Sequence, residues 1–197
     1  MSVPFFFIVY VILFTFLGLL RGWVKESVLT FGVIMALAIN LMLRKYIPLI
    51  AALVDTDPSL FWMRILMLLI WVYFSYRTVV DVPVMAERAE KRDPRHRIFD
   101  LGLGLLNGYL FVGSLLFYMH LANYPLPQFV GLPSNPTLLE MSNLLMVYMP
   151  PQVLGEPGIY FAEILAFVAV IVIYVGLPAR TQTRTGSGDA QVERQAK

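Results

Sequence analysis

The stretch GLLRGWVKES, residues 18–27, places three charged side chains between two apolar runs. Gly22 favours the left-handed backbone conformation that often ends a helix. Arg21 precedes it, where a cation stabilises the negative end of one helix, and Glu26 follows it, where an anion stabilises the positive start of the next. The stretch therefore predicts a tight turn between two helices, and the length of the flanking runs decides whether those helices lie in water or in lipid.

The flanking runs are long enough to approach the roughly 20 apolar residues that a helix needs to cross a bilayer. Val3–Leu20 and Val28–Leu43 contain no charged residue. Three further stretches meet or approach this length: Leu60–Val80, Leu101–Leu121 and Gly158–Leu177. A soluble helical hairpin is the alternative for residues 18–27, and the lengths of the runs disfavour it.

The composition points the same way. The 197 residues are 58% hydrophobic and 14% charged, against about 25% charged residues in soluble domains. The absence of cysteine excludes disulfides, thiolate nucleophiles and cysteine-based zinc sites. A net charge of +2, spread over several connections, does not indicate nucleic-acid binding. The sequence predicts an all-α integral membrane protein, a bundle of about five transmembrane helices whose main partner is the lipid bilayer.

The positions of the basic residues predict how the bundle is oriented. With the first turn in the cytoplasm, all but three of the 15 Lys and Arg residues lie on the cytoplasmic side. The exceptions are Arg44 and Lys45 on the opposite side and Arg64 inside the membrane. We therefore expect the N-terminus outside and the C-terminus in the cytoplasm.

The same pattern divides the chain into four parts. We expect four passes in residues 1–121, an extracytoplasmic loop in 122–157, a fifth transmembrane helix in 158–178 and a disordered cytoplasmic tail in 179–197. Within the loop, Asn135 is a good N-cap and is followed by an apolar stretch. This predicts a short amphipathic helix at the outer interface.

The main cytoplasmic connection, Asp81–Asp100, mixes acidic and basic side chains. Such runs are typical of solvated surface. Contact with anionic lipid headgroups or with a cytoplasmic partner is the alternative.

Gly104 and Gly108 form a small-xxx-small pattern in the fourth span, and Asn107 lies between them. Glycines at this spacing let a second helix approach closely, and a buried amide can add an interhelical hydrogen bond. The partner helix belongs either to the same chain or to a second copy in a homo-oligomer.

Arg64 and Glu163 are the charged residues that lie well within predicted spans, at similar depth from the outer surface. Because an isolated charge is costly in lipid, we predict an ion pair between them. Snorkelling of Arg64 to the surface is one alternative, and a proton or ion path is another.

His120 is expected to be an interfacial histidine rather than a metal ligand, because no acidic cluster accompanies it. The sequence contains no nucleophile elbow, Walker loop or HExxH motif. We therefore expect no catalytic, metal-binding or cofactor-binding residues, and no enzyme activity.

Two motifs taken together resemble a known family. GLLRGWVKESVLTFG, with Arg21, Gly22 and Glu26, is similar to the Arg-Gly-x-x-x-Glu turn of the colicin V production protein (CvpA) family. DLGLGLLNG, Asp100–Gly108, is similar to that family's Asp-Arg-x-x-Gly-x-x-x-Gly segment. Leu101 stands where the family commonly has Arg, and a later Arg-Gly pair is replaced by Phe111 and Val112. The resemblance covers residues 3–121.

The resemblance implies a bacterial cytoplasmic (inner) membrane protein linked to peptide-toxin production or export and to envelope homeostasis. It implies no catalytic residue. The protein would then act by associating with copies of itself or with other membrane proteins. A small channel or transporter, lined by residues such as Arg64, Asn107, His120 or Glu163, is one alternative, and an accessory subunit of a larger membrane complex is another.

Overall fold

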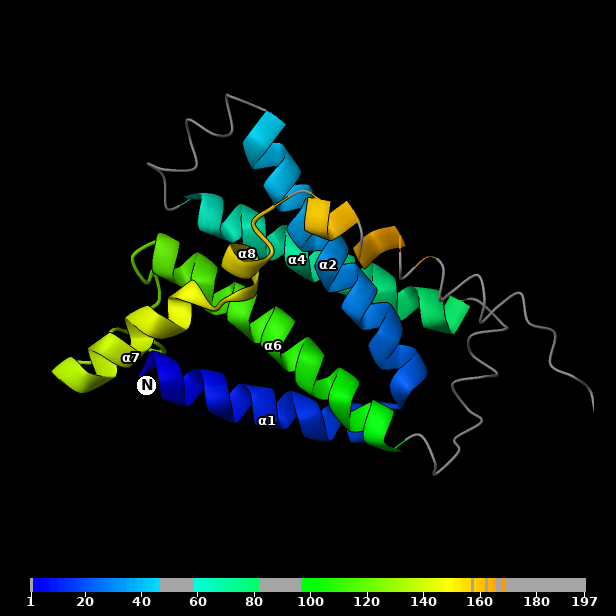
Figure 1. Cartoon of the computed structure of the whole chain (residues 1–197), viewed down its shortest axis with the longest axis horizontal. Helices are drawn as coiled ribbons and strands as arrows, with labels where there is room; N and C mark the ends of the chain where they lie inside the picture. The colour runs from blue at the N-terminus through cyan, green and yellow to red at the C-terminus, as the bar shows by residue number, and fades with distance from the viewer. Residues whose placement is uncertain are drawn as a thin grey trace, which may run out of the picture. The chain divides into compact units, whose positions relative to one another are not determined.

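The computed structural model describes residues 2–46, 59–81, 97–156, 158–161, 163–165 and 168, and this part of the chain is mainly α-helical. Four helices are long and apolar enough to cross a membrane (Figure 1): α1 (Val3–Arg21), α2 (Trp23–Tyr46), α4 (Ser59–Asp81) and α6 (Arg97–Leu121). Two shorter helices follow, α7 (Pro136–Val147) and α8 (Pro150–Val153). The predicted all-α membrane fold and the positions of its first four spans are confirmed.

The chain divides into two compact units, Met1–Leu165 and Ala166–Lys197, and the six helices above belong to the first. Residues 158–161 and 163–165, at the start of the predicted fifth span, are helical. The rest of that span apart from Val168, most of the connection between α4 and α6, and the predicted disordered tail lie outside the described residues.

Helix α6 is central to the first unit. It packs against α1 on one side and against α2 on the other, and α4 packs mainly against α2. Half of the residues in the α2 and α6 spans are buried, against 17% and 22% in those of α1 and α4. The two outer helices therefore offer most of their surface to the surrounding solvent, which for helices of this composition is lipid.

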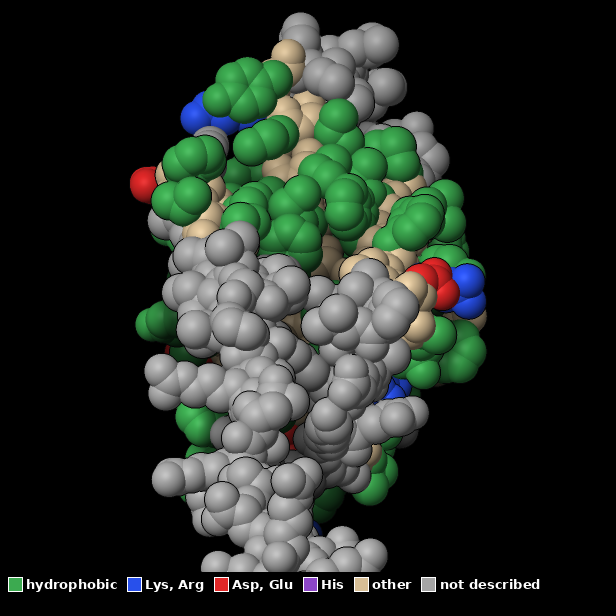
Figure 2. Space-filling view, turned by 90° about the vertical axis from the view of Figure 1, so that its right-hand side faces the viewer, with side chains coloured by type: hydrophobic (Ala, Val, Ile, Leu, Met, Phe, Trp, Pro, Cys, Tyr) green, Lys and Arg blue, Asp and Glu red, His purple; other side chains and the backbone are tan. Residues whose placement is uncertain are grey.

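The outward-facing side chains have the apolar character that lipid requires. Large side chains such as Phe16, Leu20 and Trp62 are more than half exposed. On the described part of the face shown in Figure 2, hydrophobic side chains dominate and charged side chains are few. A soluble bundle would place polar residues there, so this surface supports burial in a bilayer.

The end of the unit opposite the α1–α2 turn is closed by the segment that follows α6. Asn135 caps α7 as predicted, since its side chain accepts a hydrogen bond from the Thr137 amide at 3.0 Å. Helix α7 contacts α1, and α8 contacts α6. A backbone bridge between Ser2 and Gly131 ties the start of α1 to the same loop. The first residues of α1 are thus anchored by residues far away in sequence.

Candidate functional site

The turn between α1 and α2 consists of Gly22 alone, with φ of 86° and ψ of 153°. The positive φ agrees with the prediction, but the ψ value is far from the predicted left-handed helical conformation. This backbone region is essentially restricted to glycine. The Gly22 amide donates to the Gly18 carbonyl at 3.0 Å, and the Gly22 carbonyl accepts from the Glu26 amide at 3.2 Å. One residue therefore ends α1 and starts α2.

Because the turn is so short, the charges after it lie in the first turns of α2 and not in a surface loop. Helix α2 starts at Trp23, five residues before the predicted run, and Glu26 is only 1% exposed. Glu26 therefore lies in the first turn of α2, as predicted, but its carboxylate is buried in the bundle, which the sequence did not indicate. Its side chain points into the bundle, where it meets α6.

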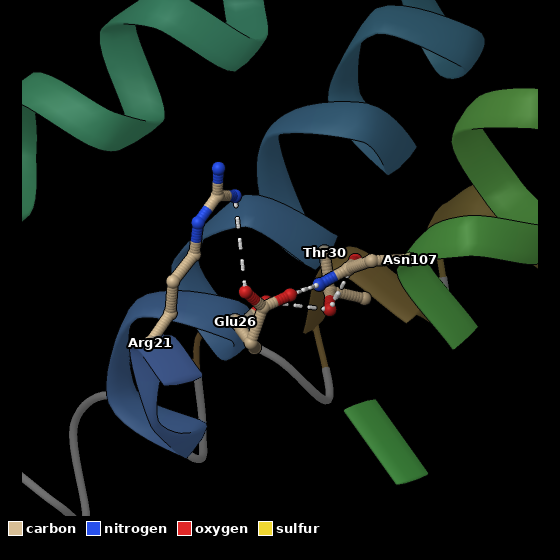
Figure 3. A network of polar contacts seen from close by, with 4 residues as sticks. All are labelled: Arg21, Glu26, Thr30 and Asn107. Carbon is tan, nitrogen blue, oxygen red and sulfur yellow. Dashed lines mark hydrogen bonds and ion pairs between the residues drawn. The ribbon is translucent and has the colours of Figure 1, made fainter. Parts of the chain in front are cut away.

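The Glu26 carboxylate has partners on both oxygens (Figure 3). Asn107 Nδ2, from α6, donates to Glu26 Oε2 at 2.7 Å and to the Glu26 backbone oxygen at 2.9 Å. Arg21 Nη1, from the end of α1, lies 3.9 Å from Glu26 Oε1. Three helices thus meet at one carboxylate.

Thr30 completes this polar cluster, one helical turn after Glu26. Its Oγ1 lies 2.8 Å from both the Glu26 backbone oxygen and Asn107 Oδ1, and its single proton is shared between these two acceptors. Thr30, Glu26 and Asn107 are all buried. We refer to Arg21, Glu26, Thr30 and Asn107 as the polar network. Polar groups are stable inside a bundle only when each buried one has a hydrogen-bond partner.

Asp100 makes a second connection between the same helices. Its Oδ1 accepts a hydrogen bond from the Trp23 amide at 2.5 Å. Trp23 is the first residue of α2, whose amide has no partner within its own helix. Asp100 therefore acts as an N-cap for α2, although it belongs to α6 and lies 77 residues away in sequence.

Gly104 and Gly108 pack against α1 of the same chain. A Cβ atom at Gly104 would lie 2.8 Å from the Phe14 backbone oxygen, and one at Gly108 would lie 3.1 Å from Val11 Cα. Of the two readings of the glycine pattern, the structure favours the intramolecular one. Gly18 completes the contact from α1, since its Cβ would lie 2.6 Å from Gly104 Cα. Sequence reasoning did not single out Gly18 as a packing residue, although a lone glycine in a bulky apolar run was a signal.

Arg64 and Glu163 lie toward the end of the unit opposite the α1–α2 turn. Arg64 is 8% exposed, and its guanidinium lies 5.4 Å from the centroid of the Tyr118 ring, within cation–π range. It also lines a small cavity of about 70 Å³ with Tyr118 and Tyr160. Glu163 Oε2 is buried without a hydrogen-bond partner. No direct ion pair between Arg64 and Glu163 is found in the described part of the chain, and their pairing stays a prediction.

His120 has an aromatic partner. Its Nδ1 lies 3.2 Å from the Tyr124 hydroxyl, in the loop after α6, and burial raises the pKa of Tyr124 above its usual value. Tyr124 and Asn123 both have positive φ, 56° and 53°, which is unusual for residues other than glycine. Within the described residues, no group of three or more His, Cys, Asp or Glu side chains could hold a metal ion. The contact with Tyr124 favours the interpretation of His120 as an interfacial residue.

The polar network joins three helices, because Glu26 of α2 accepts a hydrogen bond from Asn107 of α6 and lies beside Arg21 at the end of α1. The chain matches no family model, no curated protein and no solved structure. The family resemblance therefore rests on the motif residues and on how they meet in space.

Proposed function

We propose that the chain is a non-enzymatic inner-membrane protein of the CvpA type, which supports peptide-toxin production or export and envelope homeostasis by associating with membrane partners. One observation carries the proposal. The residues of the two resembling motifs, 80 positions apart in the sequence, belong to one set of contacts at the junction of α1, α2 and α6.

Several motif residues have a structural task in that junction. Gly22 adopts a conformation that requires glycine, and Asp100 caps α2. Glu26 binds Asn107, which lies at a variable position of the second motif. Gly104 lets α1 approach α6. A shared fold would require these residue types at these spacings. The contacts therefore support the resemblance. They give no residue a catalytic role.

The topology in the proposal has the N-terminus outside and the C-terminus in the cytoplasm, in a bacterial inner membrane. The positive-inside distribution of Lys and Arg supports it. It places the polar network at the cytoplasmic end of the bundle and Arg64 near the outer end.

A channel or transporter is the second candidate, and one observation bears on it. Arg64 lines a cavity of about 70 Å³, but neither Asn107 nor Glu163 is among the residues that line this cavity. Asn107 instead belongs to the polar network near the opposite end of α6. The polar residues that would line a path are therefore divided between two places, which favours the non-transporting role. Solute flux in proteoliposomes distinguishes the two.

The test is complementation in a bacterium that lacks its own member of the colicin V production protein family. Expression of the chain should restore release of the peptide toxin and tolerance of detergent. Asn107→Ala should weaken both because it removes the partner of Glu26, whereas Ile70→Ala, at an exposed apolar position of α4, should not. If the intact chain is present in the membrane and restores neither property, the proposal is wrong.

A further inference from the structure

A cavity of about 450 Å³ lies beside the polar network, between α1, α2, α4 and α6. This volume is within the range of about 300–1,000 Å³ that is typical of small-ligand sites. Most of its wall is apolar or aromatic and is formed by Phe14, Leu29, Leu69, Val72, Tyr73, Tyr76 and Phe111. The remaining lining residues are Arg21, Lys25 and Glu26, which lie together at the α1–α2 turn. The cavity thus has a long apolar part and one charged end.

The charged end has an excess of positive charge. Glu26 is the one carboxylate in the lining, and it already accepts a hydrogen bond from Asn107. Arg21 lies 3.9 Å from Glu26, beyond hydrogen-bond distance, and 41% of its side chain is exposed. Lys25 forms no ion pair in the part of the chain that the structure describes. Two cations are therefore available to an anion at this end.

The cavity is open toward the lipid-facing surface of α4. Leu69, Tyr73 and Tyr76 line the cavity and are about half exposed or more. Figure 3 shows Arg21 extending away from the turn, on the side where α4 lies. A molecule already in the bilayer could therefore enter sideways, with its charged group at the level of the turn.

From this combination we infer that the cavity is a binding site for an anionic phospholipid. One acyl chain occupies the apolar part, and the phosphate lies between Arg21 and Lys25. Basic pockets between transmembrane helices on the cytoplasmic side are suited to anionic headgroups, which are abundant in that leaflet. The charge at the end of the cavity favours this occupant over a zwitterionic lipid. The apolar length favours it over a free phosphate ion.

This site goes beyond the proposed function and rests on it only for the cytoplasmic location of the α1–α2 turn. A failure of toxin complementation would leave the lipid site intact, and absence of lipid binding would leave the junction of the two motifs intact.

The test measures lipid binding to the purified full chain by native mass spectrometry from detergent. The probes are dioleoyl phosphatidylglycerol and dioleoyl phosphatidylcholine, which have the same chains and different charge. We expect the anionic lipid to bind at least tenfold more tightly. Equal binding of the two lipids would overturn the inference, and so would competition by glycerol 3-phosphate as effective as that of the intact lipid.

Two matched pairs of variants, Lys25→Gln with Lys45→Gln and Leu69→Trp with Ile70→Trp, locate the site, and Lys25→Arg is a further control. Lys25→Gln should weaken binding of the anionic lipid about fivefold, the effect expected for one cation near a membrane surface. Lys25→Arg should preserve it, and Lys45→Gln, at the other end of α2, should have no effect. Leu69→Trp should fill the apolar part and reduce binding, whereas Ile70→Trp, at an exposed position outside the lining, should not. Equal losses within either pair would show a non-specific effect and overturn the assignment.

Discussion

The two ends of the bundle hold their helices together in different ways. At the end that contains the α1–α2 turn, called the turn end here, side chains of α6 form hydrogen bonds with α2. The partners are 77 to 81 residues apart in the sequence. At the opposite end most polar contacts are local: Asn135 bonds to Thr137 and His120 to Tyr124, although Tyr109 also reaches the Tyr148 carbonyl at 2.6 Å. Apolar burial does not select among helices in lipid, so close backbone approach and hydrogen bonds must do so. The turn end therefore fixes which helices pair.

The largest effect is expected where the backbones approach most closely. Gly104→Leu should destabilise the protein by about 3 kcal/mol, because overpacking forces α1 away from α6. Gly102→Leu is the matched control, since nothing lies within 4 Å of a Cβ there. Thermal unfolding in detergent measures both. Equal stability of the two variants would show that the glycine contact does not hold α1.

The turn itself should be nearly as sensitive. Gly22→Ala should cost about 2 kcal/mol, because alanine is strained at a φ of 86° and a ψ of 153°. Gly131→Ala is the control, since its nearest neighbour, the Pro127 carbonyl, would lie at an ordinary 3.7 Å. Denaturant titration of each variant gives the difference. A neutral Gly22→Ala variant would contradict the one-residue turn.

The pair of Glu26 and Asn107 provides a measure of coupling within the polar network. Asn107→Leu and Glu26→Leu should each destabilise the protein because each leaves the other residue with a buried unpaired group. The double variant should lose less than the sum, by about 1 kcal/mol. A double-mutant cycle in detergent supplies the value, and strict additivity would show that the two side chains do not interact.

The smallest effect is expected at the end opposite the α1–α2 turn. Asn135→Ala removes the cap of α7 and should cost about 0.5 kcal/mol, the low end of the range for caps, because the bond is exposed. Circular dichroism with thermal unfolding detects it, and Asn135→Ser, which preserves a capping oxygen, serves as the control. A loss as large as that of Gly104→Leu would remove the distinction between the two ends.

The first four spans could be predicted from the sequence because length and apolar content are local properties. Val3 begins α1 as expected, and Leu121 ends α6. The cap formed by Asn135 could also be predicted, since its partner Thr137 is only two residues away.

Long-range contacts could not be predicted in the same way. The burial of Glu26 depends on Asn107, 81 residues later. Nothing in residues 18–27 shows that this carboxylate has a partner in the bundle, so its burial could not be predicted from that stretch. Gly18 was missed for the same reason, because its importance arises from Gly104 on another helix.

The cap that Asp100 provides to α2 has a consequence for biogenesis. During synthesis, α1 and α2 leave the ribosome before Asp100 and Asn107 have been translated. In that interval the Trp23 amide lacks Asp100 and the Glu26 carboxylate lacks Asn107, and water and headgroups at the bilayer surface can take their places. We therefore expect the turn between α1 and α2 to stay near the bilayer surface until α6 is inserted. The two earlier helices would reach their final depth only then.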